Sequence, residues 1–197
     1  MPGHRATLVL ESHRAVRYRI AHSGLSSINP REEFMTFAAP FVSSVMEIEK
    51  DWIDYNGHLN MAYYNVLFDR CSDEAFELLG MGPHYARDRR LTVYTAEAHV
   101  CYVRELHLGD PVKCSFQLLD HDEKRIRFYQ ELSHVDGWLS ATSECLTLHV
   151  DMNGPRVTSF PADIMDKVQA MAAAHAALPM PERAGRGIGI RRKTAAA

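Results

Sequence analysis

The sequence has few cysteines, and their spacing excludes several kinds of site. The four cysteines stand singly in apolar contexts, without the C-x-x-C spacing that is typical of zinc sites and redox dithiols. We interpret Cys71, Cys101, Cys114 and Cys145 as buried free thiols in a reducing compartment. The histidines are also scattered without metal-ligand spacing, so we predict no metal site.

Long apolar runs and an excess of charge are absent as well. No apolar run reaches 18 residues, and the N-terminus lacks the uninterrupted apolar stretch of a signal peptide. With 22 Lys and Arg against 25 Asp and Glu, the formal net charge is -3, and the basic residues are dispersed. Binding to nucleic acid or to an anionic membrane needs clustered basic residues, so we expect neither partner. These absences predict a cytoplasmic protein.

A bound dinucleotide is not expected either. The glycine-containing segment GRGIGI at residues 185–190 has the wrong spacing for a dinucleotide-binding turn, and no predicted strand precedes it. We therefore predict no cofactor. The arginines around this segment suggest a solvated basic tail, with contact to the phosphates of a ligand as the alternative.

The length and the 46% of apolar residues suit one domain with one substantial core. We place an N-terminal extension at residues 1–40, with a short strand predicted within 8–20, the domain at 41–178, and a C-terminal tail at 179–197. Residues 41–50 are rich in β-branched residues and alternate as a half-buried strand does.

Residues 61–79 have the periodicity of an amphipathic helix. Apolar residues recur at steps of three and four, as in Met61, Tyr64, Phe68, Cys71, Ala75 and Leu78. Leu67, Phe76 and Leu79 widen this stripe, which predicts a helix largely covered by other structure. Gly80 and Gly82, followed by Pro83, are expected to end it.

The remainder of the domain is predicted to be mostly β. Strands are expected at 91–106, 111–119, 125–132 and 139–150 in hairpin succession, followed by a helix at 161–178. A single long helix must bury its apolar stripe against the concave face of a curled sheet, because nothing else in the chain can cover it. The fold class is therefore α+β, with an antiparallel sheet wrapped around a central helix.

The decapeptide DWIDYNGHLN, residues 51–60, places many polar groups where the predicted strand ends and the helix begins. The backbone N–H groups of roughly residues 57–62 have no helical partners and carry the positive end of the helix dipole. Asp54 can place a carboxylate beside these donors. A carboxylate with unsatisfied donors is the minimum for attack on an acyl carbonyl, directly or through water.

Thioesters suit so small a site, because a thiolate leaves without a strong general acid. Asn56, His58 and Asn60 would then orient the carboxylate or the water, or hold the loop. The structural alternative is ordinary: Asp and Asn before a helix are common caps, and Asn56-Gly57 is a common turn pair. Whether Asn60 caps the helix or takes part in catalysis stays open at this point.

The run D-x-x-D-x-N-G-H-x-N, followed by a Tyr-containing helix and by YVRELHLGDPVK, resembles the hotdog-fold thioesterases of the 4-hydroxybenzoyl-CoA thioesterase superfamily. The resemblance covers about residues 41–150. It implies Asp54 as the catalytic aspartate, with His58 and Asn60 as further catalytic residues. It also implies an acyl-CoA substrate and a homodimer or dimer of dimers, with the strand at 91–106 as the candidate edge.

A narrower resemblance is to the betainyl-CoA thioesterases of carnitine breakdown. It rests on WIDYNGHL, TVYTAEAHVCY, HDEKR, ATSE, LHVD, SFPADI and GRGIG, which span nearly all of residues 52–190. This resemblance implies hydrolysis of betainyl-CoA to glycine betaine and coenzyme A.

The residues permit a quaternary ammonium substrate, which proteins hold with aromatic faces and a nearby carboxylate. Within the strand at 91–106, alternation places Glu97 and His99 on one face and Tyr94 and Tyr102 on the other. We predict substrate contacts from Trp52, Asn56, Gly57, Tyr64, Tyr94, Glu97 and His99, with Tyr55 and Tyr63 as further possible walls. The alternatives are that these aromatics pack in the core or a dimer interface, and that His99 and Glu97 form a structural pair.

Three other functions compete with this one. Thioesterases for short, long-chain or aromatic acyl-CoAs share the motif. Hotdog enoyl-CoA hydratases carry an Asp, Asn and His together, but their His lies five residues after the Asp, whereas His58 lies four after Asp54. A non-catalytic acyl-CoA-binding module is the third, because function does not follow from fold alone.

Overall fold

The computed structural model describes residues 16–17 and 36–190. Within them, seven strands form one antiparallel sheet in the order β3-β6-β7-β8-β5, with β4 beside β6 and β9 beside β8. The long strands are β5 (Leu91–Tyr102), β6 (Pro111–His121), β7 (Arg125–His134) and β8 (Leu139–Asp151). The short strands are β3 (Phe41–Val42), β4 (Met46–Glu47) and β9 (Arg156–Val157).

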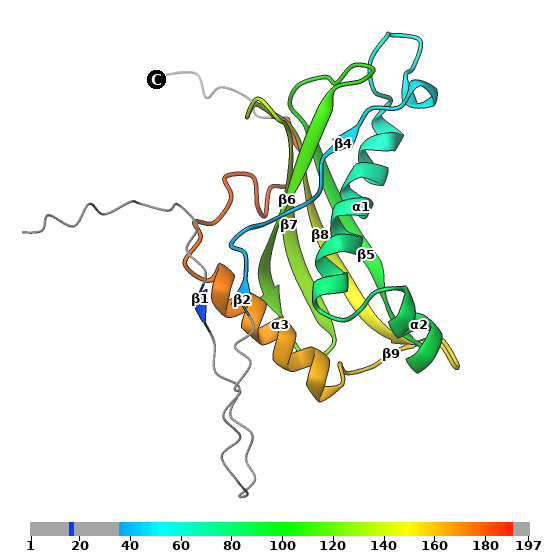
Figure 1. The fold of residues 1–197 in the computed structure, drawn as a ribbon, viewed down its shortest axis with the longest axis vertical. Helices are drawn as coiled ribbons and strands as arrows, with labels where there is room; N and C mark the ends of the chain where they lie inside the picture. The colour runs from blue at the N-terminus through cyan, green and yellow to red at the C-terminus, as the bar shows by residue number, and fades with distance from the viewer. Residues whose placement is uncertain (1–15, 18–35, 191–197) are drawn as a thin grey trace, which may run out of the picture.

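The sheet curls around α1 (Met61–Leu78), as the sequence predicts (Figure 1). The apolar face in the middle of the helix is fully buried, with Leu67 and Cys71 at 0% exposure. The residues of β6 predicted to point inward, Val112, Cys114, Phe116 and Leu118, are all buried. The prediction is wrong for the two end residues of the stripe, because Met61 and Leu78 are 66% and 48% exposed, whereas Tyr64 and Leu79 near them are buried.

The strand predicted at 41–50 is broken into β3 and β4. Between them, the Ser43 side chain accepts a hydrogen bond from the Cys114 N–H at 3.0 Å, in place of a backbone partner. The next residue turns away from the sheet, since the Ser44 N–H donates to the Glu74 carboxylate at 2.9 Å. A 3-10 turn, η1 (Lys50–Trp52), then leads into the polar decapeptide.

The predicted hairpin succession is wrong for β5, which pairs with β8 and not with β6. The connection 103–110 crosses the end of the β7–β8 hairpin, at the same end of the molecule as the decapeptide (Figure 1). The N–H groups of Val103 and Arg104 donate to the Ser140 carbonyl at 2.8 and 3.0 Å. Leu106, at 0% exposure, anchors this connection in the core.

Because of a β-bulge in β5, the predicted assignment of its side chains to the two faces of the sheet is wrong. Tyr94, Glu97 and His99 pair with Leu148, Leu146 and Glu144, which are spaced by two along β8 and so share a face. The register shifts between Thr95 and Glu97. The extra residue moves Tyr94 onto the face of Glu97 and His99, while Tyr102, opposite Ala141, points to the other face.

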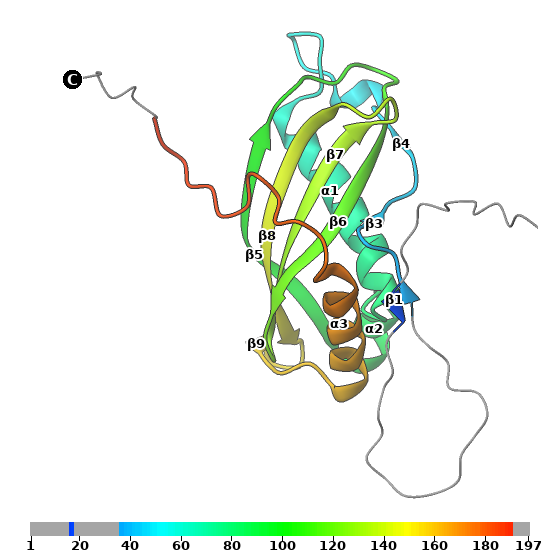
Figure 2. The same cartoon turned by 90° about the vertical axis from the view of Figure 1, so that its left-hand side faces the viewer.

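The helix α3 (Ala162–His175) lies beside the lower part of β6 (Figure 2). Its predicted buried side, Ile164, Val168, Met171 and His175, is confirmed. The His175 Nδ1 accepts the Leu118 N–H at 2.9 Å, so its Nε2–H donates to the Ala38 carbonyl at 2.9 Å. Burial lowers the pKa of His175.

The sequence did not predict the helix α2 (Pro83–Arg89), because Pro83, expected only as a stop, begins it. Tyr85 of α2 and His149 of β8 form a buried pair, with the Tyr85 hydroxyl donating to His149 Nε2 at 2.8 Å. The His149 Nδ1–H donates to the Thr158 carbonyl at 2.9 Å, so the neutral ring is fully satisfied. Burial lowers the pKa of His149 and raises that of Tyr85 to about 12.

The N-terminal extension contributes β1 (Val16–Arg17), which pairs with β2 (Thr36–Phe37). These two residues are the described part of the strand predicted within 8–20, and the rest of that segment lies outside the described residues. Phe37 is buried in the core, although the predicted domain begins only at residue 41. The predicted domain boundaries stay predictions.

Residues 179–190 run across the outer face of the sheet, opposite α1 (Figure 2). The Gly185 N–H donates to the Glu144 carboxylate at 2.6 Å, and that carboxylate also pairs with Arg127. Among the helices of residues 36–190, none has the length and apolar surface needed to cross a bilayer.

Candidate active site

The decapeptide folds into a closed turn in front of α1. Ile53 and Leu59 form a bridge at its base, the Asp54 N–H donates to the His58 carbonyl at 3.0 Å, and the Gly57 N–H donates to the Asp54 carbonyl at 3.0 Å. Gly57 has a φ of 84°, a left-handed conformation that favours glycine. The local sequence therefore builds a tight turn whose polar side chains project at the helix start.

Asn56 holds the Asp54 carboxylate. Asp54 Oδ1 accepts the Asn56 N–H at 2.7 Å, and Asp54 Oδ2 lies 3.4 Å from the Asn56 side-chain nitrogen. These contacts restrict the rotation of the carboxylate without burying it. Asp54 is thus an oriented hydrogen-bond acceptor in front of the helix, and its predicted catalytic role stays a prediction.

The row of free donors at the helix start is shorter than predicted. Four N–H groups already have partners: Gly57 with the Asp54 carbonyl, Leu59 with the Leu106 carbonyl at 2.7 Å, Asn60 with the Trp52 carbonyl at 2.9 Å, and Ala62 with the Asn60 side chain at 3.0 Å. Within the described part of residues 57–62, only the N–H groups of His58 and Met61 lack a partner. These two groups are the candidate donors to an acyl oxygen.

Asn60 is the N-cap of α1, since its Oδ1 accepts the Ala62 N–H. Its side-chain nitrogen has no hydrogen-bond partner among the described residues. Capping therefore uses one end of the amide and leaves the other end available to a ligand.

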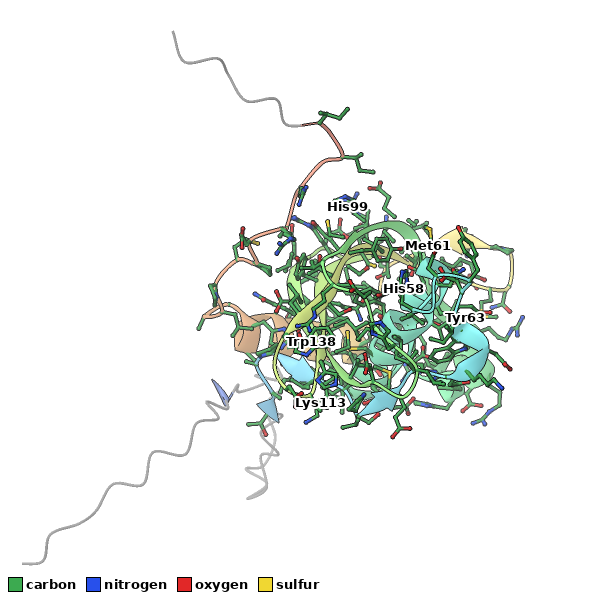
Figure 3. All side chains as sticks on the ribbon, turned by 90° about the horizontal axis from the view of Figure 1, so that it is seen from above. His58, Met61, Tyr63, His99, Lys113 and Trp138 are labelled. Carbon is green, nitrogen blue, oxygen red and sulfur yellow. The ribbon has the colours of Figure 1, made fainter. Side chains whose placement is uncertain are left out.

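A cavity of about 530 Å³ opens beside Asp54, within the usual size range of small-molecule sites. Three segments line it: the closed turn, the first turn of α1, and the end of β5 with the connection that follows. The lining residues are Asp54, Tyr55, His58, Leu59, Asn60, Met61, Tyr64, Tyr102, Val103, Arg104 and Glu105. Figure 3 shows His58 and Met61 together at the start of the helix.

Two tyrosines, Tyr64 of α1 and Tyr102 at the end of β5, form one wall of the cavity. The rings of Tyr64 and Tyr102 meet edge to face, with centroids 5.0 Å apart, and the Tyr102 hydroxyl donates to the Met61 carbonyl at 3.3 Å. Burial raises the pKa of both phenols, and the nearby charge of Glu105 adds to the effect on Tyr64. Both tyrosines therefore stay neutral near pH 7.

Comparison with known proteins shows the family to which the chain belongs. The family model of the thioesterase-like superfamily matches residues 48–168, which include the closed turn, α1 and the four long strands. The chain belongs to the thioesterase-like superfamily. A betainyl-CoA thioesterase of Pseudomonas aeruginosa is 36% identical over 141 residues, which are 71% of this chain and 89% of that protein.

Two further relatives extend the comparison. An L-carnitine dehydrogenase/betainyl-CoA thioesterase of Rhizobium meliloti is 35% identical over 74% of this chain, but the match spans only 29% of that longer protein. A hypothetical protein of Staphylococcus aureus, with a structure in complex with CoA, superposes with a TM-score of 0.72 at 25% identity. That match covers 77% of this chain and 96% of the other. The hotdog fold predicted from the sequence is confirmed.

Within this thioesterase-like domain, several predicted binding residues lie apart from Asp54. Trp52 is buried, stacks on Tyr63 with ring centroids 5.6 Å apart, and has the Arg70 guanidinium 4.9 Å from its ring centre. It does not line the cavity. The predicted loop and helix residues, Asp54, His58, Asn60 and Tyr64, do line it, while Asn56 and Gly57 shape the turn.

The predicted residues of β5 lie on the outer face of the sheet. Glu97 and His99 line a second cavity, of about 350 Å³, together with Arg127, Glu144 and residues 185–187. Tyr94 shares this face because of the bulge. Within one subunit the sheet separates them from Asp54, and Figure 3 shows His99 apart from His58. Their roles in substrate binding stay predictions.

Sequence reasoning gave no role to Arg104 and Glu105, although both line the Asp54 cavity. The only signal was their place in YVRELHLGDPVK, which carries the family resemblance. Their position depends on the connection 103–110 crossing beside the closed turn, where Leu59 and Leu106 are hydrogen-bonded.

Proposed function

We propose that this protein is an acyl-CoA thioesterase in which Asp54 is the reacting carboxylate. The observation that carries the proposal is the Asp54 carboxylate, oriented by Asn56, at a cavity that His58 and Met61 also line. Their N–H groups, without partners among the described residues, would stabilise the negative charge that develops on the thioester oxygen. His58 and Asn60 would position the thioester or a water molecule.

The reaction needs no cofactor under this proposal. Asp54 either attacks the carbonyl carbon directly or removes a proton from an attacking water. The carbon–sulfur bond then breaks, and coenzyme A leaves as a thiolate that takes up a proton. When water attacks, its oxygen becomes the second oxygen of the released carboxylic acid. When Asp54 attacks, the acyl group forms a mixed anhydride with its carboxylate, and water then hydrolyses this anhydride to release the acid and restore Asp54.

We propose betainyl-CoA as the substrate, with glycine betaine and coenzyme A as products. The support is the similarity to the betainyl-CoA thioesterase of Pseudomonas aeruginosa over 89% of that protein's length. The tyrosines and carboxylates around the cavity are compatible with a cationic acyl group. Other short, long-chain or aromatic acyl-CoAs are the alternatives.

We also propose a homodimer, or a dimer of dimers, formed through β5. Among the described residues this strand pairs with β8 alone and ends the sheet, so its other edge can continue into a second copy. Light scattering coupled to size-exclusion chromatography would test the assembly, and a monomer at micromolar concentration would contradict it.

The test of function is thiol release from a panel of betainyl, short-chain, long-chain and aromatic CoA thioesters. We expect Asp54→Asn to lower kcat by at least about a hundredfold, the usual scale for a general base. Asp51→Asn is the matched control, because Asp51 is exposed in the same decapeptide and does not line the cavity. Full activity of Asp54→Asn would refute the proposed role.

Two other outcomes would change the assignment. Equilibrium binding of acyl-CoA without any thiol release would identify a binding module. Hydration of crotonyl-CoA, measured as loss of its enoyl absorbance, would identify a hydratase.

A further inference from the structure

The chemistry of a betainyl thioester restricts where its charge can be recognised. A single methylene joins the ammonium nitrogen to the carbonyl carbon, so the two atoms lie only about 2.5 Å apart. If Asp54 acts on that carbonyl carbon, the groups that recognise the ammonium must border the same cavity as Asp54. A recognition site elsewhere in the molecule cannot serve this substrate.

Two exposed tyrosines, Tyr55 and Tyr102, line the Asp54 cavity, and of these two only Tyr102 packs against another aromatic ring of the described residues. Tyr102 is 46% exposed, and its ring packs edge-on against buried Tyr64. Glu105 is exposed on the same cavity and has no ion-pair partner among the described residues. An exposed aromatic ring and an unpaired carboxylate are the two elements with which proteins hold quaternary ammonium groups.

The neighbouring Arg104 does not neutralise the Glu105 carboxylate. The Arg104 guanidinium lies 4.0 Å from the centre of the Trp138 ring, and Trp138 does not line the cavity. Arg104 and Glu105 form no ion pair within the described part of the chain. The Glu105 carboxylate is therefore free to face a cationic ligand.

Four other aromatic or acidic side chains lie outside the Asp54 cavity and cannot contact this ammonium group. Tyr94 and Glu97 lie on the outer face of the sheet. The ring of Trp52 is already occupied by Arg70. Asp69 lines a cavity of about 310 Å³ farther along α1. It follows Asn60 by nine residues, a rise of about 13 Å along the helix, which one methylene cannot span.

We propose that Tyr102, backed by Tyr64, and the Glu105 carboxylate recognise the quaternary ammonium of the acyl group. This inference rests on the proposed thioesterase function. It replaces the predicted pairing of Tyr94 with Glu97 by residues of the connection after β5. Selectivity for a cationic acyl group then resides within the catalytic cavity.

The test compares two substrates of the same shape. In 3,3-dimethylbutanoyl-CoA, a carbon replaces the ammonium nitrogen of betainyl-CoA, so only the charge differs. The readout is the ratio of kcat/KM for the charged substrate to kcat/KM for the neutral one. We expect a ratio well above one in the unmodified protein.

Glu105→Gln should lower this ratio about tenfold, and so should Tyr102→Leu, since a cation–π contact contributes on this scale. Tyr102→Phe keeps the ring and should keep most of the ratio. Glu97→Gln tests the predicted contact on the outer face. Glu131→Gln is the matched control, because Glu131 is exposed on β7 and lines neither cavity. Thermal melting of each variant would show that the fold is retained.

The outcomes separate the two proposals. Absence of hydrolysis of either substrate would overturn the thioesterase assignment and this inference with it. Hydrolysis with a ratio near one, or a ratio unchanged by Glu105→Gln and Tyr102→Leu, would overturn only the inference. A ratio that falls in Glu97→Gln but not in Glu105→Gln would assign recognition to the outer face of a neighbouring subunit.

Discussion

Asn60 is the residue whose structural role and proposed catalytic role can best be separated by substitution. Its Oδ1 caps α1 through the Ala62 N–H at 3.0 Å, while its side-chain nitrogen has no partner among the described residues and the residue lines the Asp54 cavity. Three substitutions divide these roles. Asn60→Asp keeps the capping oxygen and removes the amide donor, Asn60→Ser keeps a weaker cap, and Asn60→Ala removes both.

The expected stabilities follow from capping alone. Loss of an N-cap side chain costs about 1 kcal/mol, which lowers Tm by roughly 2–4 °C in a chain of this size. Asn60→Ala should show this loss in thermal and urea unfolding. Asn60→Asp should be as stable as the unmodified protein, because a negative charge at a helix N-terminus is favourable.

The Asn60 variants are expected to rank differently in activity than in stability. Asn60→Asp places a second negative charge beside Asp54 and removes the donor, so its kcat should fall by about tenfold or more, the scale of a lost hydrogen bond to a charged group. Thiol release measures this. If Asn60→Asp and Asn60→Ser both keep full kcat/KM, Asn60 is a cap only and its predicted catalytic role is wrong. If Asn60→Asp melts as low as Asn60→Ala, the capping account is wrong.

Other predictions concern stability. His149 and His175 have pKa values lowered by burial, so the folded state binds fewer protons than the unfolded state. Stability should be complete above about pH 6.5 and fall below it, by up to about 2.7 kcal/mol per pH unit for the pair, as urea unfolding at several pH values would show. No loss between pH 6.5 and 5 would contradict this. Tyr85→Phe should cost about 1–3 kcal/mol by leaving His149 Nε2 without a donor, and an unchanged urea midpoint would argue against that bond. Gly57→Ala should cost about 1–2 kcal/mol from its positive φ alone, whereas Gly154→Ala, equally free of close neighbours, should be near neutral.

The helix was the part of the fold most open to prediction from sequence. Its observed bounds, Met61–Leu78, follow from signals within the segment: a 3.6-residue period, Asn60 as cap, and glycine after the last turn. The closed turn around Asp54 is also local, because the hydrogen bonds within it join residues at most eight apart. For this reason the sequence could place Asp54, His58 and Asn60 together at the helix start.

Tertiary structure decided what the local pattern could not. The pairing of β5 with β8 joins segments about fifty residues apart, and the bulge between Thr95 and Glu97 reverses a face assignment that strict alternation had made. Glu105 reaches the Asp54 cavity only because the connection after β5 crosses beside the closed turn. The sequence by itself determined where the proposed reacting carboxylate and its helix lie, since both positions depend on neighbours along the chain. The walls of the cavity were decided by the fold, because they come from segments that only strand order and register bring together.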